Sequence, residues 1–248
     1  MLRSLKELKN YSLEAKDGKI GRCKDFLFDD EHWTVRYMVA DTGKLLPGRK
    51  VLISPISIGQ PDWARQVFPV RLTKEKIKEA PGLDQDAPVS RQYEIDLSQF
   101  YGWNYYWHGT YPWGVAAYPG ALYEKPLVEE GVLEPDSGDD HLRSVNEVRG
   151  YHIKATDNDI GHVEDFIMDD ESWAIRYMVV DTLNWLPGRK VLVAPRWITT
   201  VSWADRKVAV DMNREQIKNC PEYDPAIPVN REYEEQLYDF YGRPKYWL

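Results

Sequence analysis

The chain has 248 residues, a net charge of −8 and 43% hydrophobic residues, which fits a globular protein of two domains of about 100–150 residues each. No apolar run approaches the roughly 20 residues of a membrane-spanning helix, and the start MLRSLKELKNY lacks the apolar core of a secretory signal, so we expect a cytoplasmic protein without membrane insertion. Two cysteines exclude a disulfide scaffold, and the acidic charge argues against nucleic-acid binding.

The sequence contains an internal duplication. A shift of 140 residues aligns Ser4–His108 with Ser144–Leu248 without a gap, and 47 of the 105 aligned positions are identical. Self-similarity at one fixed offset is the signature of a repeated domain. We therefore predict two repeats, over residues 1–108 and 144–248, joined by a linker over residues 109–143.

The first two-thirds of each repeat has the pattern of short strands. Tyr11–Lys16 and Ile20–Phe28 flank Asp17-Gly18-Lys19, which is typical of a hairpin turn. Thr34–Asp41 then alternates between two faces, as a strand does. Three further strands are expected over Lys50–Ile53, Ile56–Gln60 and Gln66–Val70. Six short strands joined by tight turns predict a small antiparallel barrel.

The last third of each repeat has a helical pattern. Thr73 and Asn213 are suited to cap a short helix that ends before a proline. A second helix is expected after Ser90 and after Asn230, with one apolar stripe and a glycine at its C-terminal cap. The predicted fold is mainly β: two tandem six-stranded antiparallel β-barrels, each followed by short helices, arranged about an approximate twofold.

The repeat resembles the PRC-barrel domain, known from the cytoplasmic part of the photosynthetic reaction-centre H subunit and from a ribosome-maturation protein. The resemblance rests on the G-x-x-x-D-F stretch, the strand Arg-Tyr-Met-Val, the segment LPGRKVL, and the prolines Pro55 and Pro195. The stretch is Gly21, Asp25 and Phe26 in one repeat, and Gly161, Asp165 and Phe166 in the other. Both repeats are covered. The resemblance implies the barrel fold but no single function, because members of the family act differently.

Acidic turns follow the second strand of each repeat. Their carboxylates could hold a divalent cation, although they lack the alternating spacing of a calcium loop. Solvated turn residues are the alternative reading. Arg36 and Arg176 are expected to pair with carboxylates such as Asp41 or Asp181, and Arg49 and Arg189 to aim a loop. The candidate metal ligands are Asp29, Asp30, Glu31, Asp169, Asp170 and Glu171.

No catalytic set is recognisable in the sequence. None of the five histidines aligns with another histidine at the offset of 140, so a metal site common to both repeats cannot use histidine. No HExxH, GxSxG or P-loop pattern occurs. Cys23 and Cys220 align with Val163 and Ala80, as small buried residues would. We therefore expect a protein that is not an enzyme and binds no cofactor.

An aromatic stretch, WNYYWHGTYPW, follows the first repeat. Its aromatic side chains either pack on the barrel or form a surface that binds a partner. Tyr106 and Trp107 recur as Tyr246 and Trp247, which favours packing for that pair. The residues without an aromatic counterpart form the candidate interaction surface: Trp103, Tyr105, Tyr111 and Trp113.

The function that these observations favour is a non-enzymatic protein-interaction or scaffold module. Its protein partner is unknown, the two repeats are expected to contact each other, and a homo-oligomer is compatible with the pattern. Two alternatives follow from the family resemblance alone: an accessory protein of the ribosome or RNA, and a peripheral component of a membrane complex of the photosynthetic type.

Overall fold

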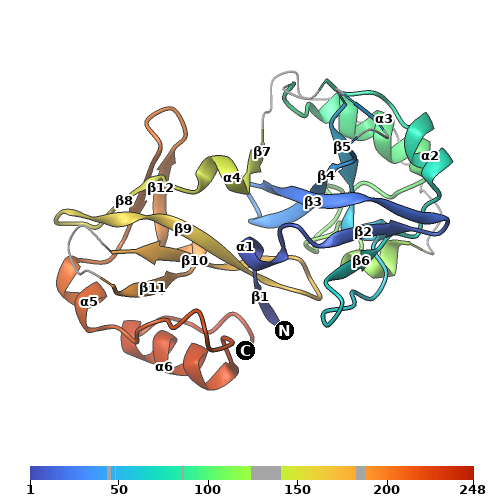
Figure 1. The fold of residues 1–248 in the computed structure, drawn as a ribbon. Coiled ribbons are helices and arrows are strands. Elements are labelled where there is room, and N and C mark those ends of the chain that lie inside the picture. Colours follow the sequence, from blue (N-terminus) through green and yellow to red (C-terminus); the bar gives the residue numbers. More distant parts are fainter. Residues whose placement is uncertain (44–45, 48, 85–86, 124–140, 183–187) are drawn as a thin grey trace. The chain divides into compact units, whose positions relative to one another are not determined.

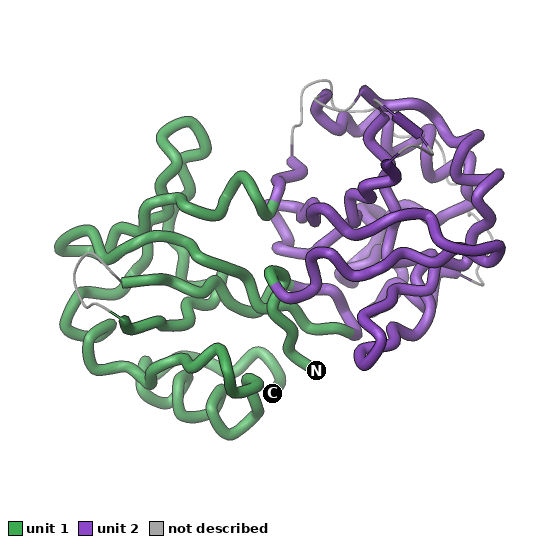
Figure 2. The backbone as a smooth tube through the Cα atoms, viewed as in Figure 1, with its two compact units in different colours: residues 1–6, 145–170, 175–248 green, residues 7–144, 171–174 purple. Residues whose placement is uncertain are grey.

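The structure is a computed structural model that describes residues 1–43, 46–47, 49–84, 87–123, 141–182 and 188–248. It is mainly β, with two sheets and short helices (Figure 1). The described chain divides into two compact units (Figure 2). Unit 1 comprises Met1–Lys6, Val145–Asp170 and Ile175–Leu248, and unit 2 comprises Glu7–Ser144 and Glu171–Ala174.

Unit 2 contains a six-stranded sheet with the strand order β5-β4-β3-β2-β6. The strand β2 pairs with the first residues of the long strand β3, and β7 pairs with its last residues. The strands are β2 (Ser12–Ala15), β3 (Gly18–Asp29), β4 (Thr34–Asp41), β5 (Val51–Ile53), β6 (Val67–Pro69) and β7 (Leu142–Ser144).

Unit 1 repeats this arrangement in a seven-stranded sheet with the order β11-β10-β9-β8-β13-β12, and β1 pairs with the end of β9. The additional strand is β12, which forms a hairpin with β13. The strands are β1 (Leu2–Ser4), β8 (His152–Lys154), β9 (Asp159–Asp169), β10 (Ile175–Asp181), β11 (Lys190–Val193), β12 (Ile198–Ser202) and β13 (Lys207–Val210).

The prediction of purely antiparallel sheets is wrong for one strand pair in each unit. β2 and β6 are parallel, and so are β8 and β13. Three strands and a 3₁₀ turn separate β2 from β6 along the chain. A connection of that length lets β6 return to the edge of β2 in the same direction, which a two-residue hairpin cannot do.

The predicted strand Ile56–Gln60 is also wrong. The chain forms a 3₁₀ turn there, η1 (Pro55–Ser57), and only an isolated bridge joins Ile58 to Val70. The turn starts at Pro55, whose ring fixes φ near the helical value, and the Ser54 hydroxyl accepts from the Ile56 N–H (3.3 Å). In unit 1 the equivalent turn η3 (Pro195–Trp197) leads into β12.

Each sheet is followed by a short helix and a longer one, as predicted. The longer helices are α3 (Arg91–Tyr101) and α6 (Arg231–Tyr241). Ser90 and Asn230 cap their N-termini, and Gly102 and Gly242 end them with positive φ, where glycine is least strained. The remaining helices are α1 (Leu5–Leu8), α2 (Lys74–Glu79), η2 (Pro119–Leu122), α4 (Val145–Val148) and α5 (Arg214–Asn219).

The strand at the start of each repeat completes the sheet of the other repeat. β1 pairs antiparallel with β9 in unit 1, with Leu2 opposite Asp169. β7 pairs antiparallel with β3 in unit 2, with Leu142 opposite Asp29. The two strands have the same sequence, Leu-Arg-Ser. We call β1 and β7 the exchanged strands. The compact units therefore differ from the repeats at their edges.

Two further segments pack within unit 2. The turn Glu171–Ala174 from the second repeat lies here, where the Val35 N–H donates to the Trp173 carbonyl (2.9 Å). Part of the predicted linker also packs within unit 2, since Trp113 and Leu122 are almost fully buried. Residues 124–140 of that linker lie outside the described residues. Among the described residues, no helix is long and apolar enough to cross a bilayer.

Candidate functional site

A carboxylate without solvent exposure lies in the core of unit 2. Glu94, on α3, accepts hydrogen bonds from the Tyr106 hydroxyl (2.8 Å) and from Arg91 Nη1 (3.0 Å). His141 Nε2 lies 2.9 Å from the same carboxylate and 3.0 Å from the Tyr106 oxygen. Tyr37 on β4 also hydrogen-bonds to Glu94. These five side chains form what we call the glutamate cluster of unit 2.

Unit 1 contains the equivalent cluster around Glu234 on α6. This carboxylate accepts from the hydroxyls of Tyr177 and Tyr246, both at 2.8 Å, and from Arg231 Nη1 at 3.0 Å. All four residues are the counterparts, at the offset of 140, of residues in the first cluster, whereas His141 aligns with Met1. The histidine therefore distinguishes the cluster of unit 2.

Burial and the neighbouring carboxylates both raise the pKa of the tyrosines in these clusters. Burial first, and then the Glu94 charge, raise the pKa of both Tyr37 and Tyr106 well above its ordinary value. Burial and Glu234 do the same to the pKa of Tyr177. These hydroxyls therefore remain protonated donors at neutral pH. With its carboxylate closed off from solvent, each cluster ties its long helix to the sheet.

Arg36 extends the network of unit 2 across β4. Its guanidinium pairs with the Asp29 carboxylate (2.8 Å), donates to the Pro112 carbonyl (2.5 Å) and lies 3.9 Å from the centre of the Tyr106 ring. Arg36 thus has a carboxylate partner, as expected, but that partner is Asp29 instead of Asp41. The reason is geometric, because the register places Asp29 opposite Thr34, near Arg36, at the end of the ladder where the network lies.

The carboxylates of the acidic turns are largely engaged by arginines. Asp29 pairs with Arg36, Asp30 with Arg143 (2.7 Å), and Asp170 with Arg3 (3.2 Å). Glu31 and Glu171 are exposed, and Asp169 is half-buried in β9. No group of three or more potential ligands converges among the described residues. Three of the six candidate carboxylates, those of Asp29, Asp30 and Asp170, therefore hold guanidinium groups.

The pKa directions of these acids differ. Burial alone would raise the pKa of Asp29, but Arg36 and the His32 N–H outweigh it and hold that pKa below its ordinary value. At Asp30 burial outweighs the hydrogen bond from Arg143, so its pKa is raised. Asp29 therefore favours its charged form more than a free aspartate does.

Two of the Arg–Asp pairs, Arg143 with Asp30 and Arg3 with Asp170, involve arginines of the exchanged strands. The aspartate of the G-x-x-x-D-F stretch binds a serine of the same strand. In unit 2 the Ser144 hydroxyl donates to Asp25 Oδ2 (2.5 Å). In unit 1 the Ser4 hydroxyl donates to Asp165 Oδ2 (2.5 Å), and the Lys6 N–H donates to Oδ1 (2.9 Å). Burial raises the pKa of Asp165 despite these donors. We call each Ser–Asp pair with its Arg–Asp pair a strand clasp.

The glycine of the same stretch has a packing role. A Cβ at Gly21 or Gly161 would collide with the carbonyl oxygen of Asp41 or Asp181 on the neighbouring strand. Gly161 also has φ +145°. Both repeats therefore need glycine where β3 and β9 cross close to their neighbours.

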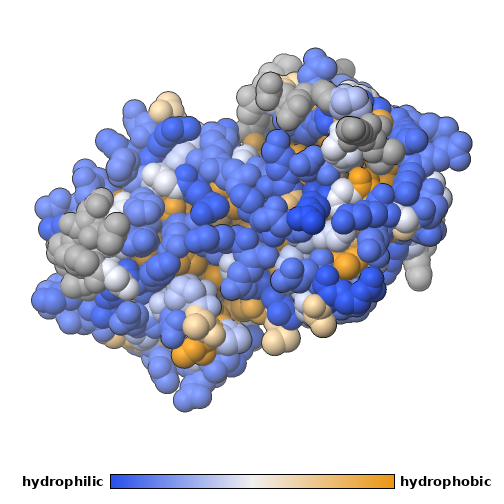
Figure 3. Space-filling model, in the orientation of Figure 1, coloured by the Kyte–Doolittle hydropathy of each residue, from blue (hydrophilic) through white to orange (hydrophobic). Residues whose placement is uncertain are grey.

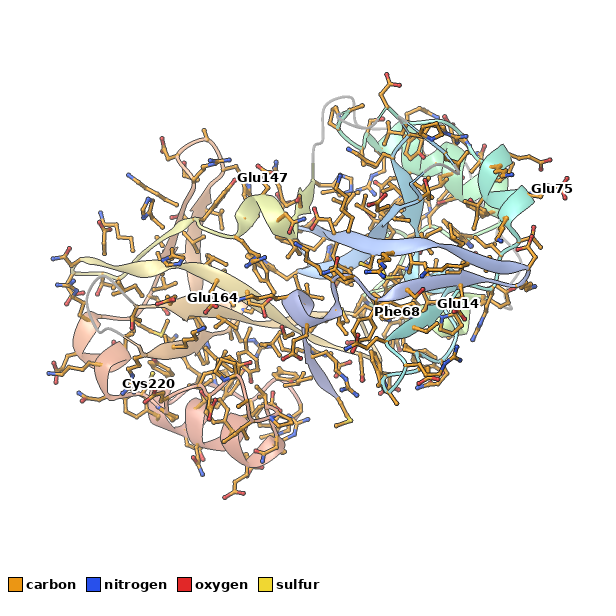
Figure 4. The ribbon with its side chains drawn as sticks, viewed as in Figure 1. Glu14, Phe68, Glu75, Glu147, Glu164 and Cys220 are labelled. Atoms are coloured by element: carbon orange, nitrogen blue, oxygen red, sulfur yellow. The ribbon has the colours of Figure 1, made fainter. Side chains whose placement is uncertain are left out.

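The LPGRKVL segment positions helix ends. Arg49 donates to the carbonyls of Lys78 (3.0 Å) and Ala80 (2.7 Å) at the end of α2, and Arg189 donates to the Cys220 carbonyl after α5. Lys190 Nζ pairs with Glu164 on β9 (2.5 Å). Figure 4 labels this glutamate. Arginine at a helix C-terminus satisfies carbonyls that lack helical partners. These residues fit the structural reading of the segment.

The aromatic candidates divide into buried and exposed residues. Trp103 is 4% exposed and donates from Nε1 to the Ser57 hydroxyl (3.0 Å). Trp113 is fully buried and donates to the Ser172 carbonyl (2.7 Å). Tyr105 is half-buried and stacks on Trp107, and Tyr111 is 58% exposed. The two tryptophans thus belong to the core of unit 2 and present no face to a partner.

The stretch after the first repeat has one buried and one exposed side. Trp113, Ala116 and Leu122 point into unit 2, whereas Tyr111, Val115 (52% exposed) and Tyr118 (45% exposed) face outward. We call these last three residues the outer face of the segment Gly109–Tyr123. Tyr111 was predicted from the sequence, whereas Val115 and Tyr118, which follow it at intervals of four and three residues, were missed.

The glutamate clusters and the strand clasps were also missed. Both were visible in principle, because Glu94, Tyr37, Tyr106 and Arg91 are each unchanged at the offset of 140, and Leu2-Arg3 extends the repeat toward the N-terminus. Identity between copies does not say which residues touch, however. Comparison with protein-family models and with curated proteins finds no match for this chain.

Proposed function

We propose that the chain is a non-enzymatic protein-interaction module made of two PRC-barrel-like repeats. The residues that both repeats keep have structural tasks. The glutamate clusters fix the long helices, the clasps hold the exchanged strands, and the glycines of the G-x-x-x-D-F stretch let strands pack closely. The strand order common to both sheets supports assigning one barrel-like fold to both repeats.

The observation that carries the proposal is the outer face of Gly109–Tyr123. The segment lies outside the repeated part of the sequence, so the shared fold does not require it. Its inner side chains anchor it in unit 2, and this anchoring holds Tyr111, Val115 and Tyr118 toward solvent. Figure 3 shows that most side chains on the face drawn there are hydrophilic. Anchored, exposed aromatic residues are typical of protein-binding surfaces.

The chemistry of the surface favours a protein with a complementary apolar patch. Tyrosine offers a broad apolar ring with one polar end, which suits an interface that is partly wet. A net charge of −8 disfavours the phosphate backbone of RNA.

A comparative pull-down tests the proposal. The wild-type chain and the double variant Tyr111→Ser/Tyr118→Ser are used as baits in a lysate of the source organism, with Ile227→Ser as the control. Ile227 is 61% exposed but belongs to unit 1. We expect one set of proteins to be captured by the wild type and the control and lost with the double variant, at unchanged melting temperature. Equal capture by all three baits would contradict the proposed surface.

A further inference from the structure

We propose that the edge of β9 that holds Met1–Lys6 accepts the same segment from a second copy of this chain, which produces strand-exchanged dimers. This inference does not rest on the outer face of Gly109–Tyr123. It begins from the finding that unit 1 is completed by a strand whose continuation, from Glu7 onward, belongs to unit 2. A strand already separated from its own repeat needs no contact from the rest of that repeat in order to dock.

The docking site recognises the strand by side chains as well as by backbone. Ser4 and the Lys6 N–H bind the two oxygens of Asp165, Arg3 pairs with Asp170, and Lys6 Nζ lies 3.0 Å from Glu164. Every acceptor in this list belongs to the second repeat. A Met1–Lys6 segment from another copy would form the same contacts. A dimer in which two copies swap this segment and a monomer that keeps it therefore differ little in contact energy.

The second clasp binds the same Leu-Arg-Ser sequence through the same types of contact. β7 carries these three residues and uses the same two side chains, Ser144 on Asp25 and Arg143 on Asp30. The same pairing therefore occurs twice, each time between residues from different repeats. A site that takes its strand from a distant part of the chain in both units is suited to take it from a second chain.

The connection that must rearrange is short. Lys6 and Glu7 lie inside α1, which has four residues. A helix of this length has little stability of its own, so reopening it costs little. A short tether gives β1 an effective concentration of about a millimolar within its own chain. Exchange between chains should therefore be minor in dilute solution and should increase when the protein refolds at high concentration.

The test uses two full-length variants, each with one cysteine added to the native pair Cys23 and Cys220. One chain carries Leu2→Cys and the other Asp169→Cys, at positions directly opposite in the β1–β9 register. The two chains are unfolded, mixed, refolded at several concentrations, oxidised, and analysed on a non-reducing gel. A mixture of Leu2→Cys with Lys16→Cys, which is exposed on the β2–β3 turn, measures disulfides formed by random collision. The double variant Leu2→Cys/Asp169→Cys in one chain tests the pairing itself.

We expect the Leu2→Cys and Asp169→Cys mixture to give several-fold more linked dimer than the Lys16→Cys mixture, with a yield that rises with protein concentration. Adding Ser4→Ala to the Leu2→Cys chain should lower that yield. A yield equal to the collision control, while the double variant closes its internal disulfide, would overturn the proposal. Failure of the double variant to close would overturn the strand pairing on which the proposal stands.

Discussion

At the scale of single residues, each unit packs a tryptophan ring against the tyrosine at the end of its long helix, but the tryptophan comes from a different element in each unit. In unit 2 Trp103, from the segment after α3, stacks on Tyr101 at 4.4 Å between ring centres and bonds to Ser57 on η1. In unit 1 the tryptophan stands at the position equivalent to Ser57 and not at the position equivalent to Trp103. Trp197 on η3 lies 5.0 Å from Tyr241, and Arg243 stands where Trp103 does. The tryptophan ring is thus supplied by the segment after α3 in unit 2 and by η3 in unit 1.

This exchange predicts a compensating pair of substitutions. Trp103→Arg alone should destabilise unit 2 by about 3–5 kcal/mol, because it removes a buried aromatic side chain. Ser57→Trp alone should cost about 1–3 kcal/mol by overpacking. The double variant should cost less than the sum of the two by at least about 0.5 kcal/mol, measured by urea unfolding. Additive losses would contradict the idea that one ring space is shared.

Asp29 gives a pH dependence with a definite sign. Its pKa is lower in the folded chain than in the unfolded one, so its contribution to stability is present above the unfolded pKa and is lost as the pH falls through the folded value. We expect Asp29→Asn to be less stable than the wild type at pH 7, and the difference to shrink below about pH 4. Unfolding free energies of both proteins between pH 7 and pH 3 measure it.

The neighbouring Asp30, whose pKa is raised, acts in the opposite direction. The Asp29 charge is one of the causes of that raised pKa, so Asp29→Asn also lowers the pKa of Asp30, and this change belongs to the measured difference. Asp96→Asn, on the exposed side of α3, is the control and should parallel the wild type at every pH. A stability difference between Asp29→Asn and the wild type that does not change with pH would show that the charge of Asp29 contributes nothing.

At the scale of secondary-structure elements, the ends of the two repeats are structural. Tyr246 donates to the buried Glu234 (2.8 Å), and its ring lies 4.3 Å from the Arg176 guanidinium. Trp247 packs at 5.1 Å from Tyr238 and at 4.1 Å from Arg231. These contacts explain why the Tyr-Trp pair recurs in both repeats.

Removal of Arg243–Leu248 should therefore loosen unit 1. The deletion takes one donor from Glu234 and uncovers Tyr238, which should lower the stability of unit 1 by about 3–5 kcal/mol. Hydrogen exchange followed by mass spectrometry should show faster exchange in β9 and β10 and no change in β3 and β4. Deleting only Leu248, which is 96% exposed, is the control. Unchanged protection of β9 and β10 would contradict a structural role for these residues.

Much of the element pattern could be predicted from the sequence because its signals are local. The strand Thr34–Asp41 and the caps Ser90 and Gly102 are encoded by alternation and by single residues, and the structure contains them. The parallel pairing of β2 with β6 could not be predicted in this way, because alternation carries no strand direction. Pro55 was read as a family mark, whereas it starts a 3₁₀ turn that replaces a predicted strand.

The candidate site was harder to predict, since its chemistry depends on distant pairs. Asp29 and Asp30 were noticed as acidic turn residues, but Asp29 is the buried last residue of β3. The arginine partner of Asp29 lies on β4, and that of Asp30 lies on an exchanged strand more than a hundred residues away. Trp113 was a candidate surface residue because it has no aromatic counterpart in the second repeat, but its Nε1–H donates to a carbonyl of the second repeat. Sequence spacing alone cannot report such contacts.

At the scale of the whole molecule, the exchange of β1 and β7 is the feature that organises the chain. Each unit draws its last strand from the other repeat, and the two clasps use the same residues at the offset of 140. Neither sheet can be complete if the other repeat is missing. Each repeat therefore supplies one strand to the sheet that the other repeat mostly forms.

Cleavage of the chain between its repeats tests this account most directly. A protease site is inserted within residues 124–140, the purified protein is cut, and the fragments are passed over a sizing column in native buffer. The account predicts that both fragments elute together and separate only in denaturant, and that Arg3→Glu with Arg143→Glu weakens their association. Fragments that separate in native buffer, each still folded, would contradict the exchange of strands.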